Sequence, residues 1–101
     1  MKGYQLTFST LQSREFQGKR VIDHLAQIAK EEGLGITIMS GAQGRGRDGE
    51  WRSASFFELA DQPLEAVMNL SEEECERLFR RLEALKMGVF YTKIPIEYGI
   101  L

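Results

Sequence analysis

The stretch that decides the fold is Leu64-Glu-Ala-Val-Met-Asn-Leu70, followed at once by Ser71-Glu-Glu-Glu74. Over residues 64–70 apolar side chains occupy every second position, which is the period of a β-strand. Ser71 and Glu74 then match the S-x-x-E capping box, and beyond them the apolar residues recur at helical spacing. The sequence therefore predicts a strand that passes directly into an amphipathic helix.

This second helix is predicted to have an apolar side and a basic side. The apolar stripe is Cys75, Leu78, Phe79, Leu82 and Leu85, and the basic residues are Arg77, Arg80, Arg81 and Lys86. We expect Gly88 to end the helix. Val89 to Ile94 is then the last strand, and Pro95 should confine its end to a sheet edge, because proline cannot donate a ladder hydrogen bond.

The residues before the opening stretch repeat the order of strand and helix. Residues 4–8 alternate in polarity and predict a half-buried strand, and residues 10–17 predict a connection. Helical spacing follows from about Gly18 to Glu32, and Gly33 fits a left-handed cap. A second strand is predicted to begin at Ile36.

The predicted order is β-α-β-β-α-β, with a long loop or hairpin arm after the second strand. Two amphipathic helices on one face of an antiparallel sheet define an α+β, ferredoxin-like fold, here a single domain over residues 1–101. The other face of the sheet needs cover, and such a face usually meets another subunit, so we expect a homo-oligomer. The residues expected there are Val67, Phe90, Thr92, Ile94 and aromatics near Phe56 and Phe57.

Composition limits the classes of function. The chain is 43% hydrophobic and 28% charged, which is typical of soluble globular domains. Its net charge of −2 is not that of a nucleic-acid-binding protein, and no apolar run approaches the roughly 20 residues that span a bilayer. The single cysteine, Cys75, excludes an intrachain disulfide framework and fits a reducing compartment. We therefore expect a cytoplasmic protein with no nucleic-acid partner.

The most unusual segment is Gly41-Ala-Gln-Gly44-Arg45-Gly46-Arg47-Asp48-Gly49, and Trp51 to Leu59 could return after it as the other arm of a hairpin. Glycine lets another molecule approach the main chain closely, and successive N–H groups can form an anion nest. Arg45 and Arg47 add planar cations suited to phosphate or carboxylate. This loop either meets an anionic small molecule, a partner protein or both, or it is a hairpin tip with solvated arginines.

Two near-matches to known motifs fail, and a third feature stays open. Gly44-x-Gly46-x-x-Gly49 has the letters of the dinucleotide fingerprint, but the fingerprint opens a helix, whereas a strand is predicted here. Residues 13–20 lack the first glycine and the final hydroxyl of a Walker A loop. Gly18-Lys19, at a helix amino terminus, is either an anion contact or simply exposed.

No catalytic constellation is visible either. His24 is the only histidine and Cys75 the only cysteine, so neither a triad nor a metal-ligand spacing is present, and we expect His24 to be structural or solvent-facing. We therefore expect a binding or signalling protein rather than an enzyme, with no catalytic and no metal-binding residues.

The chain resembles the PII-like family of small bacterial proteins, in the superfamily that also holds the PII nitrogen regulators and the divalent-cation-tolerance proteins. The resemblance runs over nearly the whole length. The matching stretches are Lys2–Thr7, Arg14 with Gly18-Lys19, Gly41-x-x-Gly44-x-Gly46, Phe57–Pro63 and Phe90–Gly99.

The resemblance implies a homotrimer whose subunits bind an adenine nucleotide of the ATP, ADP or AMP type in clefts between them, beneath the loop after the second strand. That loop docks on a membrane transporter or a regulated enzyme in the relatives. The ligand-binding residues implied here are Gly41, Gly44, Arg45, Gly46, Arg47, Gly49, Arg14 and Lys19.

Two departures from the family pattern accompany the resemblance. The family commonly has G-F-G where this chain has Gly44-Arg45-Gly46, and the T-G-x-x-G-D-G-K turn of the PII regulators is missing before the last strand. Two further hypotheses are a ligand-independent trimeric module that regulates a membrane transporter such as an ion exporter, and a small enzyme or metal-handling protein.

Overall fold

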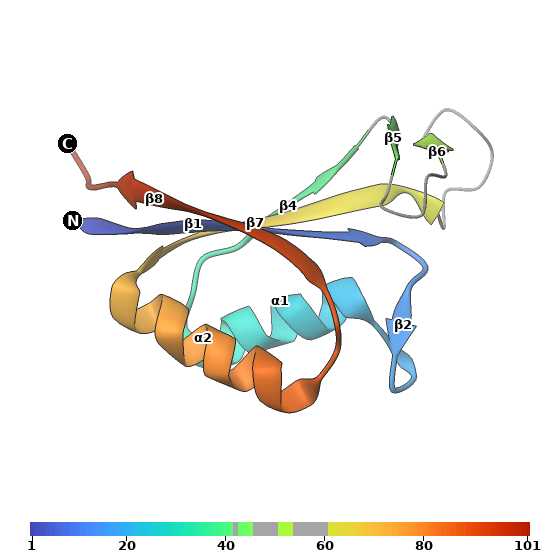
Figure 1. Cartoon of the computed structure of the whole chain (residues 1–101), viewed down its shortest axis with the longest axis horizontal. Coiled ribbons are helices and arrows are strands. Elements are labelled where there is room, and N and C mark those ends of the chain that lie inside the picture. Colours follow the sequence, from blue (N-terminus) through green and yellow to red (C-terminus); the bar gives the residue numbers. More distant parts are fainter. Residues whose placement is uncertain (42, 46–50, 54–60) are drawn as a thin grey trace.

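The computed structural model of the chain describes residues 1–41, 43–45, 51–53 and 61–101 (Figure 1). In chain order the elements are β1 (Lys2–Leu11), β2 (Glu15–Phe16), β3 (Lys19–Arg20), α1 (Val21–Glu32), β4 (Thr37–Ser40), β5 (Gln43–Arg45), β6 (Trp51–Ser53), β7 (Pro63–Ser71), α2 (Glu72–Leu85) and β8 (Phe90–Glu97).

Four strands form the main sheet in the order β4-β7-β1-β8, and each neighbouring pair is antiparallel. The central pair is the longest: β1 runs against β7 from Gly3 opposite Ser71 to Leu11 opposite Pro63. Both helices lie on the same face of this sheet (Figure 1). The predicted α+β, ferredoxin-like architecture is confirmed.

The core lies between the sheet and the two helices. Alternate residues of the central strands point into it and are almost fully buried, among them Leu6, Phe8, Ala66, Met68 and Leu70. The helices supply their apolar stripes, including Leu25 from α1 and both Cys75 and Leu78 from α2. Burial of one Leu or Phe side chain contributes about 1.5–3 kcal/mol, so this alternation is the main source of stability.

The predicted capping box at the start of α2 is confirmed. The Glu74 amide donates to Ser71 Oγ at 3.2 Å, and the Ser71 amide donates to Glu74 Oε1 at 2.9 Å. Gly33 caps α1 in the left-handed conformation, as predicted. The end predicted for α2 is wrong, because Lys86 (φ 56°) already turns left-handed and its amide bonds to the Leu82 carbonyl.

Two predictions about the first third of the chain are also wrong. Residues 10 and 11 are not a connection, because Thr10 and Leu11 continue β1 opposite β7. The first helix begins at Val21 and not at Gly18, because Gln17 (φ 52°) and Gly18 (φ 77°) are both left-handed. These two residues make the turn of a small β2–β3 hairpin, a role that favours positive φ.

The last strand extends three residues beyond the predicted Ile94 and contains Pro95 within it. Proline is tolerated there because β8 pairs only with β1 in the main sheet and is an edge strand. On the helix side of β8, the Tyr91 ring packs edge-on against Phe79 at 5.0 Å between centroids. Lys93 Nζ lies 4.0 Å from the centroid of the Tyr4 ring.

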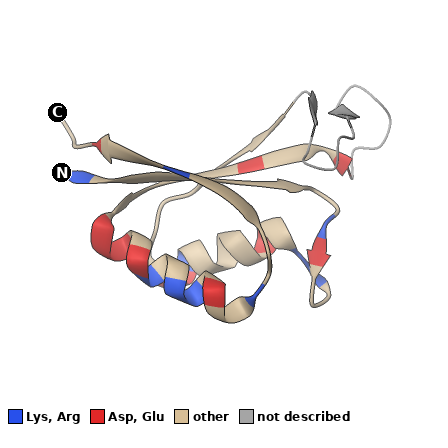
Figure 2. Cartoon of the chain, in the orientation of Figure 1, with Lys and Arg blue, Asp and Glu red and all other residues tan. Residues whose placement is uncertain are grey.

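The face of the sheet turned away from the helices carries the predicted set Val67, Phe90, Thr92 and Ile94, because their register partners on β1 alternate with buried Leu6 and Phe8. Phe56 and Phe57 lie outside the described residues. By the same alternation, Glu65 is the one charged side chain that the four described strands place on this face. Figure 2 shows that the helical layer, by contrast, is densely charged.

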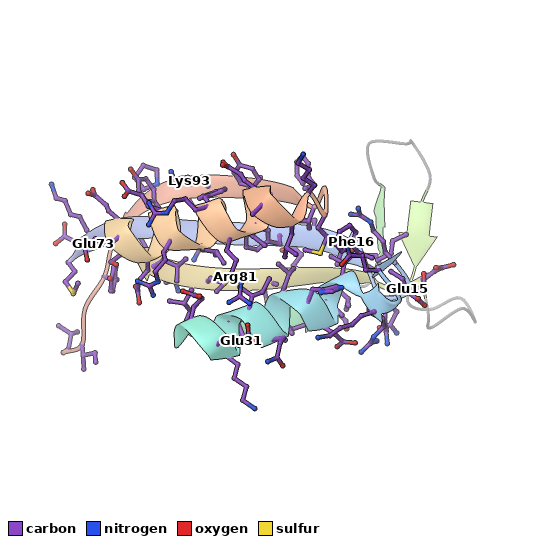
Figure 3. All side chains as sticks on the ribbon, turned by 90° about the horizontal axis from the view of Figure 1, so that it is seen from below. Glu15, Phe16, Glu31, Glu73, Arg81 and Lys93 are labelled. Carbon is purple, nitrogen blue, oxygen red and sulfur yellow. The ribbon has the colours of Figure 1, made fainter. Side chains whose placement is uncertain are left out.

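The two helices are joined by ion pairs at the end of α1. Arg77 Nε lies 2.8 Å from Glu32 Oε1, and Arg81 Nη1 lies 3.0 Å from Glu32 Oε2. Arg81 also pairs with Glu31, which lies beside it in the view of Figure 3. The Arg77 and Arg81 guanidinium groups hold the pKa of the Glu32 carboxyl below its ordinary value of 4.5.

Gly3 is predicted to tolerate no side chain. A Cβ at this position would overlap the Leu70 carbonyl oxygen and lie 3.0 Å from the Tyr98 ring, so Gly3→Ala should destabilise the fold by at least about 2 kcal/mol. Gly35→Ala is the matched control, because nothing lies within 4 Å of its Cβ. Equal urea midpoints for the two variants would contradict this packing.

The ion pairs of Glu32 predict a pH-dependent contribution to stability. Because the folded-state pKa of Glu32 is lowered, its contribution is present above pH 4.5 and is lost as the pH falls through the folded-state pKa. Arg77→Gln should therefore lower the urea midpoint at pH 7, and the difference from wild type should shrink below about pH 4. Arg80→Gln, which removes no ion pair among the described residues, should show no such trend.

Candidate functional site

The glycine-rich segment leaves and re-enters the sheet at one point. The chain departs from β4 at Ser40 and returns at Pro63, the first residue of the neighbouring strand β7. The Gly41 amide donates to the Pro63 carbonyl at 2.8 Å, and a Cβ on Gly41 would lie 3.4 Å from the Pro63 Cβ. The two ends of the excursion are therefore fixed side by side. We call residues 43–53 the arm, and Gly41 together with residues 61–63 the foot of the arm.

The arm itself contains a short antiparallel ladder between β5 and β6. In it Gly44 pairs with Arg52 and Arg45 pairs with Trp51. The predicted return strand is thus confirmed over residues 51–53, and the rest of that prediction, residues 54–59, lies outside the described residues. Gly46, Arg47 and Gly49 also lie outside them, so their predicted role stays a prediction.

A second segment supports the foot of the arm from the end of β1. The Gln12 amide donates to the Gln62 carbonyl at 2.9 Å, and Ser13 Oγ donates to Asp61 Oδ1 at 2.5 Å. Neither bond can be inferred from local sequence, because the partners lie far apart along the chain. The connection after β1 and the segment before β7 therefore form one hydrogen-bonded unit.

Arg14 lies in this unit, and its side chain points toward the carboxyl end of α2. Its Nη2 donates to the Met87 carbonyl at 2.8 Å, in the turn between α2 and β8. Its backbone is held as well, because its carbonyl accepts from the Val21 amide at 2.9 Å. The sequence singled out Arg14, but nothing in it reveals this partner 73 positions away.

Lys19 is exposed on β3, one residue before the N-cap Arg20 of α1. The prediction that Gly18-Lys19 begins the helix is wrong for the reason given above. The hairpin that carries Lys19 packs against α1 through Phe16. The ring centroids of Phe16 and His24 lie 5.6 Å apart, and the Phe16 carbonyl accepts a hydrogen bond from His24 Nε2 at 2.7 Å. Gly18 is the only signal of this turn in the sequence, because two-residue hairpin turns with positive φ favour glycine in the second position and usually have Asn, Asp or Gly in the first, where this chain has Gln17.

Some of the predicted ligand-binding residues thus lie close together. Gly41 and Arg14 lie within the hydrogen-bonded unit around the foot, and Gly44 and Arg45 lie in the arm above it. Figure 1 shows the arm and β2 at the same end of the molecule, away from the two termini. This end of the sheet is the candidate site.

A separate groove lies between α2 and β8. Its volume is about 320 Å³, and its walls include the Tyr4 and Phe79 rings, Arg80 and Lys93. Cys75, which is buried as predicted, also borders it, and burial raises the pKa of its thiol. None of the sequence-predicted ligand residues that the structure describes lines this groove.

The described residues hold no group of three potential ligands for a metal ion. No helix among them is long and apolar enough to cross a membrane.

Solved structures share this architecture, among them two PII-like proteins. A PII-like signalling protein from Thermus thermophilus superposes with a TM-score of 0.68 at 19% identity, over 94% of this chain and 87% of that one. CPII, a nitrogen regulatory PII-like protein from Thiomonas intermedia, superposes with a TM-score of 0.64 at 16% identity, over 95% of this chain and 89% of that one. That structure holds ADP, AMP and bicarbonate.

The family follows from the sequence itself. Residues 3–97 match the family DUF190, described as "Uncharacterized ACR, COG1993", and the chain belongs to it. No curated protein matches the chain. The resemblance to PII-like proteins is confirmed.

Proposed function

We propose that this protein is a PII-like regulator that binds an anionic small molecule, an adenine nucleotide, at subunit interfaces and docks on a partner protein through the arm. The observation that carries the proposal is the arm itself: a hairpin whose first strand holds Gly44 and Arg45 rises from a foot that is fixed by hydrogen bonds. The ADP and AMP bound to CPII, a protein of the same fold, support a nucleotide as the ligand.

The mechanism is a shift between conformations of the arm. Arg45 and Arg47 hold the phosphates, and the glycine N–H groups of the loop complete the anion site. Because these contacts exist only with ligand bound, the ligand favours the arm conformation that makes them. The partner protein then recognises one conformation over the other. Lys19 adds a cation at the same end of the molecule.

We further propose a homotrimer in the cytoplasm, formed through the face of the sheet opposite the helices. That face carries one charged side chain among the described residues, and Phe90 and Ile94 on it are each about half exposed in the single chain. Apolar faces of this kind are commonly covered by another copy of the same chain. In this proposal the protein acts by binding, not by catalysis.

The second candidate is a trimeric interaction module that regulates a membrane transporter without any ligand. The observation in its favour is that bonds within the chain, Gly41–Pro63 and Gln12–Gln62, close the foot of the arm. The two candidates differ in whether partner docking responds to nucleotide. A pull-down of a candidate exporter that survives the double change Arg45→Ala and Arg47→Ala without nucleotide would favour the module.

The ligand proposal predicts heat on titration of the protein with ATP, ADP or AMP in a calorimeter. Arg47→Ala should weaken the binding about ten- to a hundredfold, because a charged hydrogen bond to phosphate contributes about 1.5–3 kcal/mol. Arg80→Ala, on the helical layer, is the control and should bind as wild type does. Absence of heat with every nucleotide would contradict the proposal.

The trimer proposal predicts that a charge in the middle of the open sheet face prevents assembly. Val67 lies opposite Thr7 on the central strand, so Val67→Glu should give monomers in sedimentation velocity where wild type gives trimers. Arg80→Glu, on α2, should remain trimeric. A Val67→Glu variant that sediments like wild type would place the interface elsewhere.

A further inference from the structure

The α2–β8 turn contains a left-handed residue that carries a side chain. Lys86 (φ 56°) and Gly88 (φ 74°) are both left-handed, and Met87 between them buries its side chain in the core. A left-handed conformation is unfavourable for a residue with a Cβ and persists where neighbouring groups hold it. The Met87 carbonyl is held by Arg14 Nη2 at 2.8 Å.

The support comes from the segment that also holds the foot of the arm. Gln12 and Ser13 bind Gln62 and Asp61, and the next residue, Arg14, binds the turn. Three consecutive residues thus bridge two regions that are not adjacent in sequence. The Arg14 backbone is fixed at both ends, by Leu11 at 3.2 Å and by Val21 at 2.9 Å, so a displacement of this segment moves its guanidinium too.

The turn leads directly into the open face of the sheet. It is followed by Phe90, the first residue of β8, which lies on that face opposite Ser9. The turn is therefore adjacent along the chain to the surface that we propose for assembly. Arg14 joins this turn to the segment that binds the foot of the arm.

We propose that Arg14 is a positioning residue that holds the α2–β8 turn and couples it to the arm, so that ligand occupancy at the arm sets the conformation of the turn. The coupling rests on the proposed function, whereas the positioning role does not. Because coupling between two regions is reciprocal, the turn also influences ligand affinity at the arm. In this role Arg14 acts through Met87 and does not touch the ligand.

Hydrogen exchange on the ligand-free protein tests the positioning role. In Arg14→Gln the peptide over residues 86–91 should exchange at least about tenfold faster than in wild type, because the lost bond lowers the cost of local opening, while the core peptide over residues 64–70 should not change. Arg14→Lys, which keeps the positive charge and most of the side-chain length, should be intermediate and guards against a Gln variant that fails to fold. Arg80→Gln is the matched control. Unchanged exchange over residues 86–91 in Arg14→Gln would overturn the proposal.

The same measurement with ADP tests the coupling. ADP should slow exchange in both the arm, residues 43–53, and the turn of wild type, but only in the arm of Arg14→Gln. A turn that is still protected in Arg14→Gln would overturn the coupling. If ADP protects neither region of wild type, the proposed function fails and the coupling fails with it, while the ligand-free comparison still decides the positioning role.

The salt dependence of ADP affinity separates this role from direct contact with phosphate. A cation that contacts phosphate contributes to the fall of affinity with salt, as it does in nucleic-acid complexes. Arg14→Gln should therefore weaken ADP binding without changing the slope of log affinity against log salt, and Arg47→Ala should reduce that slope. A reduced slope in Arg14→Gln would show direct contact and overturn the positioning role.

Discussion

The antiparallel pairing of β1 with β7 is the constraint on which the rest of the molecule depends. It runs without interruption from Gly3 opposite Ser71 to Leu11 opposite Pro63, and a one-residue shift would expose the buried alternate side chains. Gly3 is part of this constraint, because the Leu70 carbonyl fills the place of a side chain. The pairing brings the end of β1 and the start of β7 together, and it is there that the arm begins.

The candidate functional site lies where the pairing of β1 with β7 ends. The last ladder partner of β1 is Pro63, whose carbonyl also accepts from Gly41, so the arm rises from a fixed foot. The next residues of the β1 connection bind the foot on one side and, through Arg14, the α2–β8 turn on the other. In this chain the α2–β8 turn is short and its Met87 carbonyl is held by Arg14. In the proposed mechanism a ligand at the arm is thereby connected to the start of β8 and to the open sheet face.

The sequence predicts the features that depend on neighbours along the chain. The capping box at Ser71 and Glu74 and the alternation of residues 64–70 involve partners within a few positions, so their patterns are visible in the letters. The bonds Ser13–Asp61 and Arg14–Met87 join residues 48 and 73 positions apart, and no local pattern encodes them. The sequence predicts the start of α1 too early, at Gly18, for another reason. The apolar periodicity that begins at Val21 obscures the hairpin turn at Gln17-Gly18. The left-handed Lys86 was missed because glycine is the usual signal for that conformation.

Native mass spectrometry of the purified protein tests the central claim most directly, because one spectrum reports both the number of subunits and any bound small molecule. We expect an ion with the mass of three chains, and a series of adducts with the mass of an adenine nucleotide when ADP is added. A single chain, or a trimer that never carries a nucleotide at any ADP concentration, would contradict it.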